Sequence, residues 1–315
     1  MGSRIPNVDE TANLYERQVI GNKNDTVAGN SLVSLVKQGL NETPASNDTW
    51  YVNGGAGTTG DGTSWGTAFK TMTEAVAAAG NYDTIYVGGG YYTEAAVMDI
   101  DQHGLRIIGT GSGAQWGACG FGSATSGDTI MTINANRVEI SGIAFWCLTD
   151  AKHGIVLGTS YDSWNTWIHD CAFGTGVGGN TLGEYGVKAN ESEDCANTLI
   201  EDCYFNYMST AAIVTAATRM VIRRNLIWSN AIGIDIENEG YAFANCAVYD
   251  NHIIGRGSGT GIKLASTEPA DGTVYVGNNN VTNFSTNITP GKGDAGLVNN
   301  GTYGDSSTWT KIDPT

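Results

Sequence analysis

Short segments with alternating apolar residues recur along the chain from about residue 129 to residue 284. Six of them align on one shared position, which we call the anchor: Ile143, Cys171, Cys203, Asn225, Asn251 and Asn279. Subtraction of these numbers gives spacings of 28, 32, 22, 26 and 28 residues. A second apolar phrase precedes each of the last five anchors, at 154–157, 186–189, 212–215, 233–236 and 261–264. Two phrases that recur together at this loose period indicate a repeat architecture.

The spacing of apolar residues within each phrase predicts β-strands. Val138 and Ile140 flank a polar residue, as do Ile234 and Ile236, so one face of each segment is buried. The segments are short, rich in β-branched residues and bounded by turn residues. Strands that recur once per coil, with loops of varying length between them, stack in parallel on their own copies. The sequence therefore predicts an all-β fold, a parallel β-helix, over residues 97–285.

The anchors are predicted to form an internal ladder. Stacking places each anchor about 4.8 Å from the anchor of the next coil. Asn225, Asn251 and Asn279 would then point inward and bond to one another through their amides. Cys171 and Cys203 would continue the line as small apolar fillers.

The N-terminal part of the chain has a different pattern. Residues 1–48 are predicted to be a leader with helices near 9–20 and 31–40. It is too small to bury a core alone, so it packs on the β-helix, on a neighbouring chain or in a larger assembly. Residues 49–96 begin the β-helix and include a helix at about 67–79, which covers the open end of the solenoid.

Three further regions lack the strand pattern. Residues 111–127 and 174–185 are predicted to be inserted loops, which on a solenoid tend to gather on one flank and form its binding face. Residues 286–315 are predicted to be a tail without a clear strand or helix.

Residues 49–96 resemble a known group of proteins. The segments WYVNGG at 50–55 and DTIYVGGGYYTE at 83–94 are similar to the N-terminal part of right-handed β-helix proteins of the pectate-lyase-like superfamily. Gly89 and Gly90 stand where that superfamily usually has Pro-Gly. The resemblance implies a right-handed β-helix. It also implies two activities to weigh, namely a polysaccharide lyase or a glycoside hydrolase.

The leader carries a second resemblance. The block RQVIGNKNDT at 17–26, followed by GNSL at 29–32, looks like a leader found on structural proteins of tailed phages and related environmental viruses. This resemblance implies a virion component, by analogy a homotrimer, that docks on other virion proteins through residues 1–48.

Charge and hydropathy narrow the range of partners. The chain has 16 Lys and Arg against 32 Asp and Glu, a net charge of −16, which disfavours nucleic acid and anionic membranes. No run of eighteen apolar residues predicts a membrane span. Residues 1–6 lack the apolar core of a signal peptide, so we expect synthesis in a host cytoplasm. The resemblance of the leader implies residence in a virion.

Cysteine and histidine spacing predicts no cofactor. The six cysteines contain no CxxC, and we expect free, mostly buried thiols. The four histidines share no ligand spacing; they are His103, His153, His169 and His252.

The residues just before the anchors are the candidates for chemistry. Stacking would place Asp170, Asp202, Arg224 and Asp250 in one column. By the superfamily resemblance, the acids would hold Ca²⁺ and the arginine would act as base in a lyase, or the acids would flank a glycosidic bond in a hydrolase. The alternative is structural, because tight turns favour short polar residues and the arginine neutralises like charges. The residue types favour this structural interpretation.

Two further sets of residues complete the candidates. Asp235, Glu237 and Glu239 form another acidic cluster, the last two expected to face solvent. Aromatic faces bind sugars or fill cores, and five tryptophans lie beside loops and strand ends: Trp116, Trp146, Trp164, Trp167 and Trp228.

Three functions follow from these observations. The preferred hypothesis is a virion decoration, spike or fibre with possible glycan binding. The alternatives are a carbohydrate-active lyase or hydrolase, such as a tailspike-like depolymerase, and a glycan-binding module without turnover.

Overall fold

The computed structural model of the chain describes residues 47–94, 96–111, 119–123, 129–147, 153–159, 163–174, 183–189, 195–228, 231–236, 246–264, 274–289 and 296–298. The chain divides into two units, Met1–Asn47 and Asp48–Thr315, and all described strands and helices belong to the second. The predicted leader helices at 9–20 and 31–40 lie outside the described residues. Among the described residues, no helix is long and apolar enough to cross a membrane.

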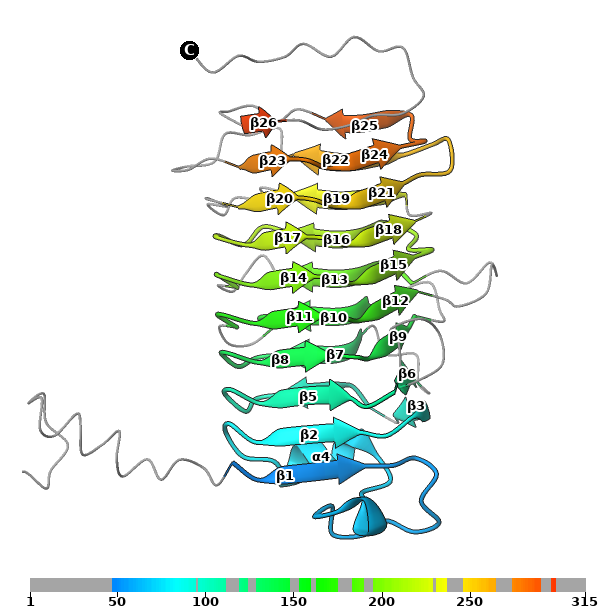
Figure 1. Cartoon of the computed structure of the whole chain (residues 1–315), viewed down its shortest axis with the longest axis vertical. Coiled ribbons are helices and arrows are strands. Elements are labelled where there is room, and N and C mark those ends of the chain that lie inside the picture. Colours follow the sequence, from blue (N-terminus) through cyan, green and yellow to red (C-terminus); the bar gives the residue numbers. More distant parts are fainter. Residues whose placement is uncertain are drawn as a thin grey trace, which may run out of the picture. The chain divides into compact units, whose positions relative to one another are not determined.

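The second unit is a right-handed β-helix whose coils rise from β1 to β26 (Figure 1). Each complete coil supplies one strand to each of three sheets, and every strand pair is parallel and in register. This arrangement confirms the predicted fold. It follows from the short alternating phrases, each of which buries one face against the copy above and below.

The first sheet begins each coil, and its last strand ends at the last described residue. Its order is β1 (Thr49–Val52), β2 (Thr84–Val87), β5 (Arg106–Gly109), β8 (Glu139–Ser141), β11 (Trp167–His169), β14 (Leu199–Glu201), β17 (Val221–Arg223), β20 (Ala247–Tyr249), β23 (Tyr275–Gly277) and β26 (Gly296–Val298).

The second sheet follows the anchor corner. It contains β3 (Gly90–Glu94), β6 (Cys119–Ser123), β9 (Ala144–Trp146), β12 (Ala172–Gly174), β15 (Tyr204–Asn206), β18 (Leu226–Trp228), β21 (His252–Ile254) and β24 (Asn280–Thr282).

The third sheet closes each coil. It contains β4 (Met98–Ile100), β7 (Thr129–Ile133), β10 (His153–Leu157), β13 (Tyr185–Ala189), β16 (Ala211–Thr215), β19 (Ile232–Ile236), β22 (Thr260–Leu264) and β25 (Thr286–Thr289).

The core lies between the three sheets and is built from identical positions stacked on one another. Phe145, Phe173 and Phe205 show the principle on the second sheet. Their rings are fully buried, nearly parallel, and separated by 4.9 Å and 4.7 Å between centroids. In-register parallel strands repeat one side-chain direction at every coil, so like residues stack.

A short helix covers the N-terminal end of this core. The predicted helix at 67–79 is divided into a 3₁₀ turn, η1 (Trp65–Thr67), and α4 (Met72–Ala78), because Phe69 pairs with Val52 between them. Met72 and Ala75 of α4 are buried, and Thr71 forms a capping box with the third helical residue.

The structure places strands where the sequence showed only loop or tail. β6 lies inside the segment 111–127. Its alternating glycines left only Cys119 and Phe121 as apolar residues, too few for the pattern to predict a strand. β25 and β26 lie in the segment 286–315 and pair with β22 and β23. Their short sequences show little alternation of apolar residues, and both strands form by hydrogen bonding to strands of the preceding coil.

Candidate functional site

The asparagine anchors lie inside the first corner of each coil and form a continuous ladder. Asn225 Nδ2 donates to Asn251 Oδ1 at 3.0 Å, and Asn251 Nδ2 donates to Asn279 Oδ1 at 2.9 Å. The Oδ1 atom of Asn251 also accepts from the backbone N–H of Asn225. All three side chains are buried, so the ladder stabilises the corner and offers nothing to a ligand.

The cysteine anchors extend the same line. Cys171 and Cys203 are buried, and the backbone N–H of Cys203 donates to Asn225 Oδ1 at 3.0 Å. All six cysteines are buried, and none forms a disulfide. Burial raises the pKa of Cys203 well above its usual range and raises the pKa of Cys246 to about 11, so these two stay protonated and unreactive at neutral pH.

The residues before the anchors serve the turn rather than one shared site. Asp170, Asp202, Arg224 and Asp250 all have positive φ, between 52° and 58°, the left-handed conformation that short polar side chains tolerate best. Arg224 binds Asp202 through two hydrogen bonds of 2.9 Å and 2.6 Å. Asp170 instead pairs with the neighbouring His169. Asp250 is exposed, and its side chain takes no part in the hydrogen bonds among these described residues. The predicted column is thus divided.

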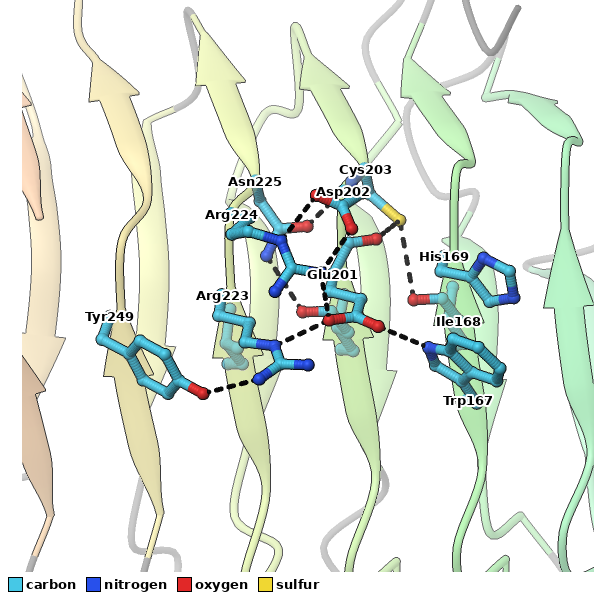
Figure 2. A network of polar contacts seen from close by, with 12 residues as sticks. Trp167, Ile168, His169, Glu201, Asp202, Cys203, Arg223, Arg224, Asn225 and Tyr249 are labelled. Atoms are coloured by element: carbon cyan, nitrogen blue, oxygen red, sulfur yellow. Dashed lines mark hydrogen bonds and ion pairs between the residues drawn. The ribbon is translucent and has the colours of Figure 1, made fainter.

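The strongest polar cluster centres on Glu201, which the sequence did not single out (Figure 2). Glu201 ends β14 and points outward from the first sheet, yet only 4% of the residue is exposed. Its Oε1 accepts from Trp167 Nε1 at 3.0 Å. Its Oε2 accepts from Arg223 Nε at 2.7 Å and from Arg224 Nη2 at 2.6 Å. We call Trp167, Glu201, Arg223 and Arg224 the Glu201 network.

The charges of this network are fixed by mutual contact. Burial opposes ionisation of Glu201, but hydrogen bonds from Arg223 and Trp167 and the charges of both arginines outweigh it, so its pKa is lowered. The hydrogen bond from Arg224 likewise lowers the pKa of Asp202, and Asp202 raises the pKa of Arg224. The acids therefore stay ionised and the arginine stays protonated at neutral pH.

Two outward columns of the first sheet surround the network. One column contains Trp167, Leu199, Val221, Ala247 and Tyr275, and the other contains His169, Glu201, Arg223, Tyr249 and Gly277. The residue two places before each anchor occupies the second column. Alignment on the anchors thus places Glu201 and Arg223 at the same position of neighbouring coils, but only the side-chain conformations show that these two residues bond.

Aromatic rings on these columns are exposed and held in place. Trp167 stacks on His169 with ring centroids 3.9 Å apart, and its N–H is bound to Glu201, yet it is 39% exposed. Tyr275 is 40% exposed and lies against Gly277, where an added Cβ would come within 2.3 Å of the tyrosine hydroxyl. Fixed, partly exposed rings are the features that bind the faces of sugars.

The other predicted tryptophans lie elsewhere. Trp164 is 38% exposed in the turn before β11, and Trp228 is 41% exposed on the second sheet beside Tyr207. Trp146 packs edge-on against Tyr91, also on the second sheet. Trp116 lies outside the described residues.

The described residues do not fit the predicted calcium site. Within the ranges that the structure describes, no group of three or more His, Cys, Asp and Glu side chains is placed to hold a metal ion. Arg224, from the coil that follows, forms an ion pair with Asp202, and its positive charge would repel a cation there. Asp235 forms an ion pair of 2.8 Å with Lys263, while Glu237 and Glu239 lie outside the described residues.

Sequence comparison agrees with the architecture. Residues 124–304, more than half of the chain, match the model of the right handed beta helix region family, and the chain belongs to this family. No curated protein matches the sequence.

Several solved structures have a similar fold. Pectate lyase Pel9A is 11% identical with a TM-score of 0.49, and the match covers 78% of each chain. The tailspike protein of E. coli bacteriophage HK620, in complex with a pentasaccharide, is 18% identical with a TM-score of 0.47. That match covers 74% of this chain and 42% of the tailspike, so this chain spans less than half of the tailspike's length. The Dettilon tailspike protein is 14% identical with a TM-score of 0.46, and the match covers 87% of this chain and 51% of the tailspike.

Proposed function

We propose that the protein binds polysaccharide through the outer face of the first sheet. The observation that supports this proposal is the pair of exposed, fixed rings, Trp167 and Tyr275, with arginine and carboxylate groups between them. Four coils separate the two rings, about 19 Å at the spacing of parallel strands. A chain of several sugars would stack on the rings and hydrogen bond to the polar groups.

Binding fits this face better than turnover. A general acid needs a raised pKa at neutral pH, whereas the pKa values of Glu201 and Asp202 are lowered. A base must give up its proton, whereas the pKa of Arg224 is raised. The lyase and hydrolase hypotheses therefore receive no support from these residues.

The charge balance favours a neutral glycan. Glu139 pairs with Arg106, and Glu201 and Asp202 pair with Arg223 and Arg224, so each described arginine on this face is matched by an acid. The surface offers no excess positive charge to a uronate, and the whole chain carries −16. Neutral sugars need only rings and hydrogen-bond partners.

Affinity electrophoresis tests the proposal. The wild-type chain is run through gels that contain dextran, galactomannan, xyloglucan, polygalacturonate or alginate. We expect retardation by at least one neutral polysaccharide and no comparable retardation by the two acidic ones. Trp167→Ala should abolish most of the retardation. Trp228→Ala is the matched control, because Trp228 is equally exposed but lies on the second sheet, and it should migrate like wild type.

Other outcomes would overturn this proposal. Retardation that is equal in Trp167→Ala and wild type would place binding elsewhere. New reducing ends, or ultraviolet absorbance from unsaturated products, would instead establish a hydrolase or lyase.

We further propose that the β-helix is carried on a virion as a decoration, spike or fibre. The resemblance of residues 17–32 to phage leaders supports this role, and the trimeric state and docking through residues 1–48 remain part of the proposal. Light scattering of the full chain should give a trimer, and deletion of residues 1–48 should lower the number of chains per particle. A monomer that the deletion leaves unchanged would contradict the proposal.

A further inference from the structure

A second group of aromatic rings, one exposed and two half-buried, lies at the N-terminal end of the same sheet face. Tyr51 of β1 and Tyr86 of β2 are register partners, and their rings stack with centroids 5.9 Å apart. Trp65 of η1 packs edge-on with Tyr51, with ring centroids 4.9 Å apart, and is 44% exposed. We call these three residues the N-terminal aromatic cluster.

The turn that carries Trp65 is rigid. The backbone N–H of Tyr51 donates to Gly62 O, and Gly62 N–H donates to Thr67 O, each at 2.8 Å. The side chain of Ser64 accepts from Thr67 N–H and caps η1. These bonds define the turn that carries Trp65, and its ring packs edge-on against Tyr51.

The two aromatic groups lie on one track. Register partners connect Tyr86 through Ile108 and Ser141 to His169, on which Trp167 stacks. Three coils span about 14 Å, a distance longer than a disaccharide. Ser141 is short, and the ion pair of Arg106 and Glu139 occupies the neighbouring column. A single extended chain can thus cross from one group of rings to the other without leaving the sheet face.

We propose that the N-terminal aromatic cluster is a second stacking subsite for the same neutral polysaccharide, so that full affinity requires an oligosaccharide long enough to reach both groups of rings. This inference rests on the proposed function and adds the extent and direction of the bound chain, along the axis of the β-helix. Trp65 lies in η1, several coils from the Glu201 network, so its replacement should leave that network intact.

Calorimetry with fragments of defined length tests this inference. The probes are size-fractionated acid hydrolysates of the neutral polysaccharide that retards the wild-type chain. Trisaccharides are compared with fragments three or more times as long. We expect Trp65→Ala to weaken binding of the long fragments by about fivefold to tenfold and to leave trisaccharide binding unchanged. Trp167→Ala should weaken both, and Trp228→Ala neither.

The outcomes separate this inference from the proposed function. If no panel polysaccharide binds, the proposed function fails. If the polysaccharide binds but Trp65→Ala and Tyr86→Ala leave the affinity for long fragments unchanged, the second subsite alone is overturned. Thermal unfolding of each variant identifies any loss that comes from misfolding, and Tyr86→Ala provides an independent replacement if Trp65→Ala does not fold.

Discussion

At the scale of single residues, two positions side by side in the sequence have opposite tasks. The anchor side chains point inward and satisfy buried polar groups, as Asn251 does with five hydrogen bonds to its neighbours. The residue before each anchor adopts positive φ and points outward. Arg224 shows the cost of this arrangement, because arginine is uncommon in that conformation, and two hydrogen bonds to Asp202 offset the strain.

The ladder makes a prediction at this scale. Asn251→Ala should lower the free energy of unfolding by roughly 1–3 kcal/mol, because it removes the acceptor of the buried backbone N–H of Asn225 and one hydrogen bond from each of the amides of Asn225 and Asn279. Urea unfolding followed by circular dichroism measures the effect. Asn278→Asp is the control, since Asn278 is exposed, has positive φ and precedes the next anchor. Equal midpoints for Asn251→Ala and wild type would contradict a stabilising ladder.

At the scale of elements, the capping helix depends on a carboxylate from a strand. Glu94 ends β3 and is 4% exposed. It accepts hydrogen bonds from Met72 N–H at 2.9 Å and from Thr73 Oγ1 at 2.6 Å, at the N-terminus of α4. A negative charge there also complements the helix dipole. Glu94, the last residue of the segment 83–94 that resembles the superfamily, is thus a structural cap.

Replacement of this cap tests the element. Glu94→Gln should destabilise the N-terminal end by about 1–2 kcal/mol, because it removes a charged acceptor from the first turn of α4. Amide hydrogen exchange should show faster exchange in α4 and β1 while the coils around β17 keep their protection. Uniform loss of protection along the whole solenoid would show instead that the cap and the coils unfold together.

At the scale of the whole molecule, acidic groups with lowered pKa values make stability depend on pH. Arg106 lowers the pKa of Glu139 against the opposing effect of burial, and the Glu201 network lowers those of Glu201 and Asp202. A lowered folded-state pKa stabilises the fold above the ordinary glutamate value of 4.5, and this stabilisation declines as pH falls through the folded-state value.

Urea midpoints measured from neutral pH down to about 3 test this linkage. We expect Glu201→Gln to be less stable than wild type at neutral pH and to lose less stability on acidification. Asp250→Asn, which changes an exposed corner carboxylate outside the network, should follow the wild-type curve more closely. Parallel curves for Glu201→Gln and wild type would contradict the network's contribution.

Sequence pattern alone determined the parallel β-helix and its anchor ladder. One-dimensional alternation, repeated once per coil, leaves a chain few other ways to bury its apolar faces, so the positions of Asn225 and Asn251 followed from counting. The same reasoning did not predict the strands β6 and β25. Their glycine and polar residues show no apolar alternation, and these strands form by pairing with neighbouring coils.

Only the tertiary structure decided which polar side chains meet. The sequence placed Asp170, Asp202 and Arg224 in one column. Which of these side chains form hydrogen bonds depends on their conformations as well as on their positions along the column: Arg224 binds Asp202, whereas Asp170 binds His169. Glu201 became the centre because Trp167 from the coil below and two arginines from the coil above converge on its two oxygen atoms. Such convergence depends on the rotamers of four side chains, which the spacing of residues along the chain does not determine.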